Sequence, residues 1–167
     1  MLRLEFPNIS HKDSYERLIK EWGKFEKTPS SPSKLFVGKD FEDFLERVIS
    51  DITHNEKGVN SHLFFLIDDS EILGGIQIRH HINHPNLIEL GGHIGYGIAP
   101  KYRKKGYATV MLQLGLEEAK KLGLKKVLLT CDIGNIGSNK VIQKNGGVFE
   151  RKTNDGAKNR YWIEIKK

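Results

Sequence analysis

The sequence predicts a mixed α/β (α+β) fold in one domain that spans residues 1–167. The length of 167 residues suits a single domain of ordinary size. Segments with strand or helix periodicity follow one another in the order β-α-α-β-β-β-α-β-α-β-β. The pattern changes at Pro100. The strands before it are arranged as in antiparallel hairpins, and a β-α-β unit follows it.

The first third of the chain is expected to hold one strand and two helices. Residues 2–6 alternate apolar and polar side chains, as a half-buried strand does. A helix over about residues 11–26 follows, with Ser10 near its N-cap, and the Pro- and Ser-rich residues 28–33 end it. Asp40 is expected to cap a second helix, whose apolar positions 41, 44, 45, 48, 49 and 52 form one face.

A stretch rich in strands is expected next. Residues 62–67 and 71–80 have the pattern of two strands, and the turn at 68–70 joins them into a hairpin. Residues 87–98 are expected to form a third strand, which contains Gly91, Gly92, Gly95 and Gly97. Glycines inside a strand indicate a bulge or the close approach of another backbone.

Helices and strands alternate after Pro100. A basic loop over residues 100–105 precedes an amphipathic helix at 106–122, which Gly123 ends. A strand at 126–131 and a short helix at 136–145 follow. Residues 148–152 and 160–165 are expected to form the last hairpin, because Asp155-Gly156 is a strong turn signal.

Composition limits the class of protein. Hydrophobic residues make up 38% and charged residues 29% of the chain, which is typical of a globular protein. The longest apolar run, residues 63–67, is far too short to span a membrane, and residues 1–6 lack a secretory segment. Cys131 is the single cysteine, which excludes an intramolecular disulfide. We therefore expect a cytoplasmic protein without a membrane partner.

The most informative segment is the loop that follows the third strand. The strand ends at Ile98, a basic run follows, and a helix begins near Gly106. Helix N-termini expose unpaired N–H groups and carry partial positive charge, so they attract phosphates. The alternative is a solvated basic loop. The segment is not a Walker loop, and Gly95-Tyr96-Gly97 lacks the third glycine of a Rossmann fingerprint.

The residues of this loop resemble a known family. Arg103-Lys104-Lys105-Gly106-Tyr107-Ala108 matches the Arg/Gln-x-x-Gly-x-Gly/Ala loop of GNAT-superfamily N-acetyltransferases. Pro100 before the loop, the long helix after it and the later Asn135-Ile136-Gly137-Ser138 segment also resemble that family, over about half the chain. The resemblance implies a GNAT fold. This is a central, mostly antiparallel, splayed sheet of six to seven strands flanked by about four helices.

The resemblance also implies acetyl-CoA as cosubstrate and no metal. It assigns the cofactor's pyrophosphate to the loop residues Arg103, Lys104, Lys105, Gly106, Tyr107 and Ala108. The pantetheine arm would pair with Ile98 and its neighbours at the strand end, in the gap between splayed strands. Asn135 and Ser138 would lie near the cofactor on the other side of that gap.

The implied reaction is direct attack of a primary amine on the thioester. An alkyl amine with a pKa near 10.4 is about one part in a thousand neutral at pH 7.4, a penalty of about 4 kcal/mol. The resembling family often places an acidic or polar group on the strand before the loop, which makes His93 the first candidate for the base and Glu89 the second. The alternative role of His93 is structural.

The general acid is the point at which the chain departs from the family. The family's usual tyrosine position is occupied by Ile142. Tyr96, Cys131 or water are the candidates to replace it, and Cys131 also fits a buried core position. This departure keeps open a second function, a GNAT-like module that binds acyl-CoA without catalysing transfer.

Partners follow from the same reasoning. The acceptor is expected to be a small-molecule or peptide amine, and a homodimer is an alternative to a monomer. Residues 28–39 are expected to contribute to acceptor specificity by analogy with the family. The excess of 27 basic over 21 acidic residues raises nucleic acid as a competing partner, but no nucleic-acid motif supports it. His80 and His81 would point to opposite faces of a strand, so no metal is expected at His80, His81 and His84.

Overall fold

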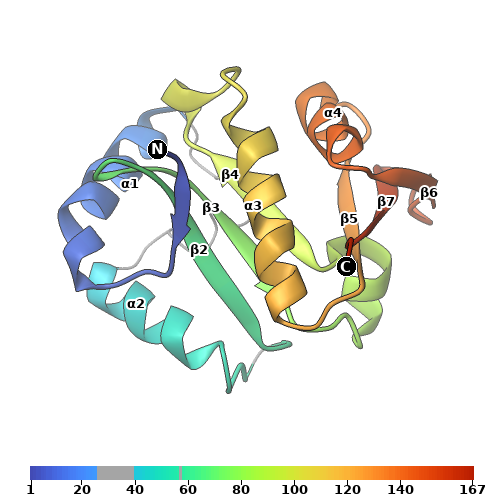
Figure 1. Ribbon diagram of the computed structural model, residues 1–167, viewed down its shortest axis with the longest axis horizontal. Coiled ribbons are helices and arrows are strands. Elements are labelled where there is room, and N and C mark those ends of the chain that lie inside the picture. The colour runs from blue at the N-terminus through green and yellow to red at the C-terminus, as the bar shows by residue number, and fades with distance from the viewer. Residues whose placement is uncertain (26–39, 57) are drawn as a thin grey trace.

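The computed structural model describes residues 1–25, 40–56 and 58–167. Its strands form two antiparallel sheets (Figure 1). The first sheet has the order β1-β2-β3-β4 and consists of β1 (Arg3–Glu5), β2 (Ser61–Asp68), β3 (Glu71–Arg79) and β4 (Ile94–Ile98). The second has the order β5-β7-β6 and consists of β5 (Lys126–Asp132), β7 (Lys158–Glu164) and β6 (Val148–Lys152). The mixed α/β fold and its antiparallel pairing are confirmed.

Helices cover both faces of the first sheet. α1 (Lys12–Phe25) and α2 (Phe41–Ser50) lie on one side, and α3 (Tyr107–Lys121) lies on the other (Figure 1). α4 (Ile136–Lys144) packs against α3 and β5. One buried cluster, with Trp22, Phe44 and Phe65, fills the α1–α2 side, and a second, with Ile76 and Met111, fills the α3 side. Burial of this apolar surface stabilises the arrangement of the two sheets.

The first two helices begin close to the predicted positions, but one of the two predicted N-cap residues is wrong. Asn8, not Ser10, caps the first helical segment, because its side chain accepts the Ser10 N–H at 2.9 Å. A single 3-10 turn, Ile9–His11, then precedes α1. Asp40 does cap α2, since its carboxylate accepts the Asp43 N–H at 2.8 Å. The predicted loop at 28–33 and the proposed specificity segment 28–39 lie outside the described residues.

The third predicted strand is wrong over its first half. A short helical turn, Leu87–Gly91, replaces it, and β4 begins only at Ile94. Gly92 explains the break, because its φ of 65° lies in the left-handed region. A Cβ at Gly92 would also lie 2.4 Å from the Leu128 carbonyl oxygen. The predicted close backbone approach is therefore real, and it occurs at the start of the strand. We call residues 87–92 the strap.

The two sheets meet at β4 and β5 and then separate. The His93 N–H donates to the Leu128 carbonyl at 2.7 Å, and the Leu128 N–H donates to His93 Nδ1 at 2.9 Å. Beyond this junction, the described strands include no ladder between β4 and β5. Both strands run toward the edge where the loop before α3 and the start of α4 lie (Figure 1). We call the region between residues 96–98 of β4 and residues 131–138, which the Tyr96–Ser138 contact bridges, the wedge.

Candidate active site

The loop between β4 and α3 presents a row of backbone donors. Lys104 and Gly106 both have positive φ, 62° and 84°, so the chain turns sharply before α3 begins at Tyr107. Within the described part of the chain, the N–H groups of residues 104–108 make no hydrogen bond. Consecutive free N–H groups at a helix N-terminus form an anion-binding concavity. The side chains of Lys104 and Lys105 are exposed beside it.

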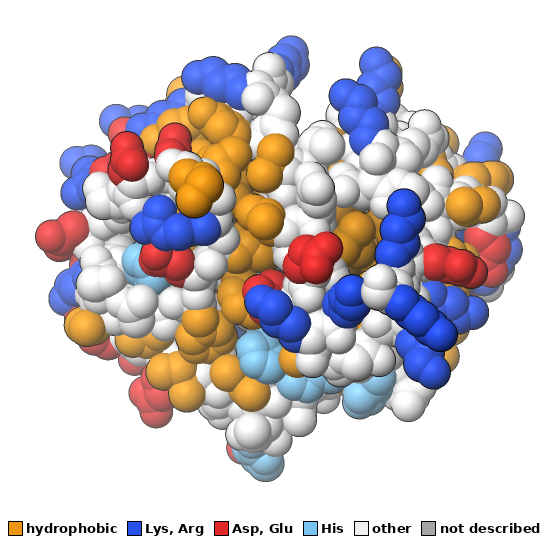
Figure 2. All heavy atoms as spheres, in the orientation of Figure 1, with side chains coloured by type: hydrophobic (Ala, Val, Ile, Leu, Met, Phe, Trp, Pro, Cys, Tyr) orange, Lys and Arg blue, Asp and Glu red, His pale blue; other side chains and the backbone are white. Residues whose placement is uncertain are grey.

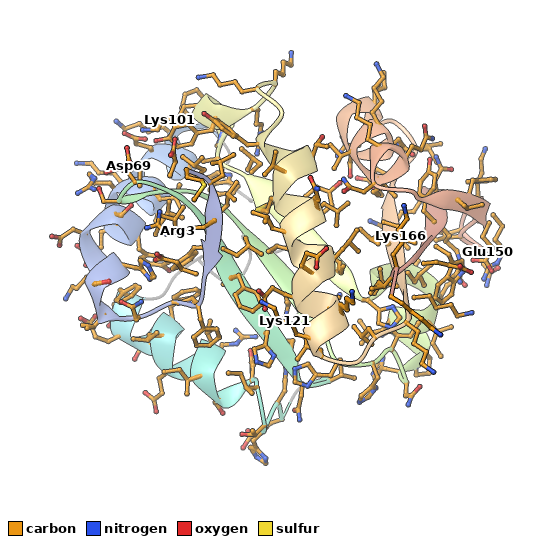
Figure 3. The ribbon with its side chains drawn as sticks, viewed as in Figure 1. Arg3, Asp69, Lys101, Lys121, Glu150 and Lys166 are labelled. Carbon is orange, nitrogen blue, oxygen red and sulfur yellow. The ribbon has the colours of Figure 1, made fainter. Side chains whose placement is uncertain are left out.

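Arg103 and Lys101 hold this loop in place. Arg103 Nε donates to the Ile98 carbonyl at 2.9 Å, and the guanidinium lies 5.9 Å from the centre of the Trp22 ring. Lys101, labelled in Figure 3, forms a 2.8 Å ion pair with Glu21 of α1. The Arg103 side chain therefore turns back toward the strand end, whereas the sequence pattern had grouped its charge with those of Lys104 and Lys105.

The opposite wall of the wedge is the start of α4. Asn135 caps that helix, because its Oδ1 accepts the Ser138 N–H at 3.1 Å. Asn139 then donates to the Asp132 carbonyl at 3.1 Å, which joins α4 to the end of β5. Figure 2 shows a notch between this helix and the loop before α3, with basic side chains on both rims. Anionic ligands are favoured at such a notch.

Tyr96 crosses the wedge from β4 to α4. Its hydroxyl lies 2.7 Å from Ser138 Oγ, and either oxygen is able to donate. Burial raises the pKa of Tyr96 to about 12, so the phenol is neutral and can donate a hydrogen bond at pH 7. Cys131 is buried near the same hydroxyls, and burial raises the pKa of its thiol as well. A protonated thiol is a weak nucleophile.

His93 lies at the junction of the two sheets and not in the wedge. The side chain is buried, and desolvation, helped by the charge of Arg79, lowers its pKa to about 4. Its Nδ1 accepts the Leu128 N–H, so the neutral ring carries its proton on Nε2. No lone pair of the neutral ring is left to accept a proton from an amine.

Glu89, the second candidate base, lies on the strap. Its carboxylate accepts from Arg151 Nη2 at 2.9 Å and from the Asn154 N–H at 2.5 Å. These bonds lower its pKa to about 2, which makes it a poor base at neutral pH. Of the three predicted catalytic residues, only Tyr96 lies between the loop and α4.

Sequence reasoning missed the partners of these residues. Nothing local to Tyr96 indicates Ser138, which lies 42 positions away.

The histidines of the predicted His80, His81 and His84 group are arranged differently from a metal site. Nε2 of His80 lies 2.8 Å from Nδ1 of His62 on β2. Across the described ranges, no group of three or more His, Cys, Asp or Glu side chains could hold a metal ion. None of the helices in those ranges is long and apolar enough to cross a membrane.

Comparison with known proteins defines the class. The family model of the acetyltransferase (GNAT) domain matches residues 3–148, so the chain belongs to the GNAT acetyltransferase family. Over 139 residues it is 29% identical to YnaD, an uncharacterized N-acetyltransferase of Bacillus subtilis (strain 168), covering 80% of this chain and 74% of YnaD. Over 112 residues it is 27% identical to YjdG, another uncharacterized N-acetyltransferase of that strain, covering 66% of this chain and 62% of YjdG.

A solved structure supports the same fold. RimL, described as a ribosomal L7/L12 α-N-protein acetyltransferase in complex with coenzyme A, superposes with a TM-score of 0.68 at 18% identity. The superposition covers 98% of this chain and 94% of RimL. The GNAT fold predicted from the loop and the segments around it is therefore confirmed. In the described residues, the strands that the resemblance placed in one splayed sheet form two sheets, of four and three strands.

Proposed function

We propose that this protein transfers the acetyl group of acetyl-CoA to a primary amine. The observation that carries the proposal is the row of free N–H groups at residues 104–108, which lies between the end of β4 and the first turn of α3. The pyrophosphate of acetyl-CoA fits such a row, with Lys104 and Lys105 adding positive charge beside it. Family membership supports this choice over an ordinary solvated loop.

The wedge offers backbone groups to the pantetheine arm. In the β3–β4 ladder, the Arg79 N–H donates to the His93 carbonyl and the Ala99 N–H donates to the Leu73 carbonyl. Backbone groups alternate between the two edges of a strand. The intervening residues Tyr96 and Ile98 therefore turn their backbone groups away from β3, toward the wedge, where the Ile98 carbonyl also accepts a hydrogen bond from Arg103 Nε. The amide groups of pantetheine can pair with this edge as an added strand would.

The hydroxyl pair Tyr96–Ser138 is proposed to stabilise the leaving group. In the reaction the neutral amine nitrogen bonds to the carbonyl carbon and gives up one proton to water, the C–S bond breaks, and the thiolate takes up a proton, which yields the amide and the free thiol of CoA. A thiol has a pKa of about 8.5. A phenol with a pKa of about 12 therefore stabilises the thiolate by donating a hydrogen bond, and the proton itself comes from water. This pair replaces the family tyrosine, which is Ile142 here.

No protein base is proposed for the amine. His93 and Glu89 have their acceptor atoms engaged, as described above. We propose that the amine loses its proton to water and that only its neutral form reacts. The acceptor is proposed to be a small-molecule or peptide primary amine, which the likeness to RimL supports at the level of fold alone. The single domain over 1–167, the cytoplasmic location and a homodimer stay predictions.

The experiment is an acetyl-CoA assay with detection of free thiol across a panel of amines. The panel consists of amino acids, polyamines and short peptides with free N-termini. Mass spectrometry identifies each product by the mass of one added acetyl group. Turnover with at least one amine supports the proposal. Tight acetyl-CoA binding without turnover on any amine would favour the non-catalytic binding module. Absence of acetyl-CoA binding would contradict both functions.

A further inference from the structure

The strap is attached to both sheets. On the side of the second sheet, Thr130 Oγ1 of β5 donates to the Leu90 carbonyl at 2.5 Å. On the side of the first sheet, Arg79 of β3 donates to the Gly91 and Gly92 carbonyls at 3.3 and 2.9 Å. The strap therefore bridges two sheets that share no ladder among the described strands.

Arg160 of β7 makes the most buried of these attachments. Only 3% of its surface is exposed, and Nη1 donates to the carbonyls of Ile88 and Glu89. Carbonyls of a short helix lack partners within the helix and carry partial negative charge, so a guanidinium satisfies both needs. Two arginines from different sheets, Arg79 and Arg160, thus hold the carbonyls of one turn.

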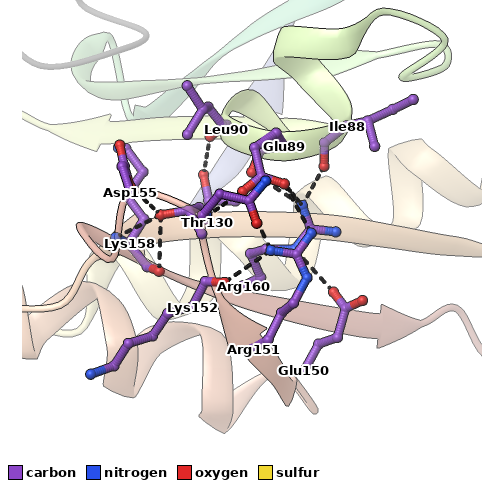
Figure 4. Close-up of polar contacts among 12 residues, drawn as sticks. Ile88, Glu89, Leu90, Thr130, Glu150, Arg151, Lys152, Asp155, Lys158 and Arg160 are labelled. Carbon is purple, nitrogen blue, oxygen red and sulfur yellow. Dashed lines mark hydrogen bonds and ion pairs between the residues drawn. The ribbon is translucent and has the colours of Figure 1, made fainter.

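The charge of Arg160 is balanced within the same cluster. Its Nε donates to Glu150 Oε2 at 3.1 Å, and its Nη1 lies 3.6 Å from Glu89 Oε2 (Figure 4). Glu89 is held in turn by Arg151 and by the Asn154 N–H of the β6–β7 turn. A planar guanidinium can make all of these bonds at once, whereas a lysine offers a single point charge.

The strap lies immediately before β4 in the chain, so it affects the direction in which that strand begins. It leads directly into His93, which makes the last backbone contact with β5 before the strands part. Tyr96 and Ile98, the proposed contacts of pantetheine and thiolate, follow three and five residues later. The direction in which β4 leaves β5 therefore depends on how the strap is held.

We propose that Arg160, paired with Glu89, is a positioning residue that sets the width of the wedge and so the binding of acetyl-CoA. Arg160 does not contact the reacting atoms. It acts through the strap and the His93–Leu128 junction, and this inference rests on the proposed function. The same pairing gives Glu89 a structural role in place of the catalytic one predicted from its sequence position.

Two variants and two controls test this role. Arg160→Lys keeps the positive charge but removes the planar guanidinium with its several N–H donors. Glu89→Gln keeps the shape of the side chain but removes its negative charge. Arg17→Lys is the matched control, because Arg17 forms an exposed ion pair with Glu71 on the first sheet. Val48→Ala removes buried apolar volume from the other core cluster and controls for lost stability alone.

Two measurements are made on each variant. Calorimetric titration gives the Kd of acetyl-CoA, and we expect Arg160→Lys and Glu89→Gln to raise it about 10-fold while both controls stay within about 2-fold. Amide hydrogen exchange by NMR, without ligand, should be faster at His93 and Leu128 in both test variants. Amides of the β2–β3 ladder should exchange as in the Val48→Ala control.

The outcomes separate the two levels of inference. Wild-type affinity together with wild-type exchange at His93 and Leu128 in Arg160→Lys and Glu89→Gln would overturn the positioning role. A wild-type protein that binds no acetyl-CoA would contradict the proposed function, and the ligand-free exchange data would still decide whether Arg160 holds the junction. A fall in kcat for Glu89→Gln with a changed pH profile and unchanged Kd would assign Glu89 to catalysis instead, and would overturn the inference.

Discussion

The hydroxyl of Tyr96 on β4 lies 2.7 Å from Oγ of Ser138 on α4, so one side-chain hydrogen bond spans the wedge between two sheets. A bond in this place does two things. It ties β4 to α4, and it places two hydroxyl groups side by side between the strand and the helix. In the proposed function, the loop at residues 104–108 binds the pyrophosphate of acetyl-CoA and directs the thioester to this point.

Tyr96→Phe should slow the chemical step more than it weakens binding. Loss of one preorganised donor to the thiolate is expected to lower kcat by about 10²-fold and to change the Kd of acetyl-CoA little. Ser138→Ala should have a smaller effect of the same kind, and the double variant should fall short of the product of the two. Steady-state kinetics and titration measure these quantities.

Tyr161→Phe is the control for this prediction. Tyr161 is also a buried phenol bonded to α4, through Asn139 at 2.6 Å, but it lies on β7 and not on β4. If Tyr161→Phe lowers kcat as much as Tyr96→Phe does, the effect comes from a loosened α4 and not from a lost donor.

Gly106→Asp should weaken acetyl-CoA binding strongly. Gly106 has a φ of 84°, so any side chain is strained there, and a carboxylate would repel the pyrophosphate. Gly123→Asp is a matched control, because Gly123 has the same φ of 84° and equally open space at the other end of α3. Both variants should lose about 1 kcal/mol of stability, and only Gly106→Asp should raise the Kd. Equal Kd values for the two folded variants would refute the loop assignment.

His93 should make folding stability depend on pH without affecting the pH dependence of the rate. Its folded pKa of about 4 lies below the unfolded value near 6.5, so the unfolded state binds more protons between these values. The corresponding stability, about 3 kcal/mol, should be complete above pH 6.5 and should be lost as the pH falls toward 4. Urea unfolding from pH 4 to 8 measures this loss, and His93→Gln should flatten it.

The pH dependence of the rate should follow the pKa of the amine and not that of a protein side chain. With a slow alkyl amine, kcat/KM is expected to rise tenfold per pH unit up to the pKa of the amine, in wild type and in His93→Gln alike. A plateau near neutral pH that disappears in His93→Gln would show that His93 is a base after all.

Gly92→Ala should destabilise the protein, and Gly23→Ala should stabilise it. At Gly92 a Cβ would meet the Leu128 carbonyl oxygen at 2.4 Å and φ is positive, so we expect a loss of about 2–4 kcal/mol. At Gly23, inside α1, a Cβ would meet nothing within 4 Å, and we expect a gain of about 0.5–1 kcal/mol from helix propensity. Thermal unfolding of both variants checks the signs, and a neutral Gly92→Ala would contradict the tight junction.

The features that the sequence predicted well are local ones. The end of β4, the loop and the start of α3 lie within about a dozen residues, so periodicity and Gly106 were enough to place them. Asp40 likewise acts on its own helix. The GNAT fold followed from the order of such segments and not from any single residue.

The features that sequence analysis missed depend on contacts between residues far apart in the chain. The sequence predicts one glycine-rich strand over residues 87–98, but Arg79 and Arg160 bond to the carbonyls of a helical turn in its first half instead. His93 has the right side chain for a base, and only burial against β5 removes that ability. The partner of Tyr96 could not be inferred, because no local rule connects β4 with α4.

The most direct test of the account is an NMR titration of the wild-type protein with acetyl-CoA, followed through backbone amide shifts. We predict that the largest changes fall on the amides of residues 104–108 and on Tyr96 and Ile98, with loss of the Tyr96–Ser138 hydroxyl contact. Shifts confined to other surfaces, or no shifts at millimolar acetyl-CoA, would contradict the claim that the loop and the wedge hold this cofactor.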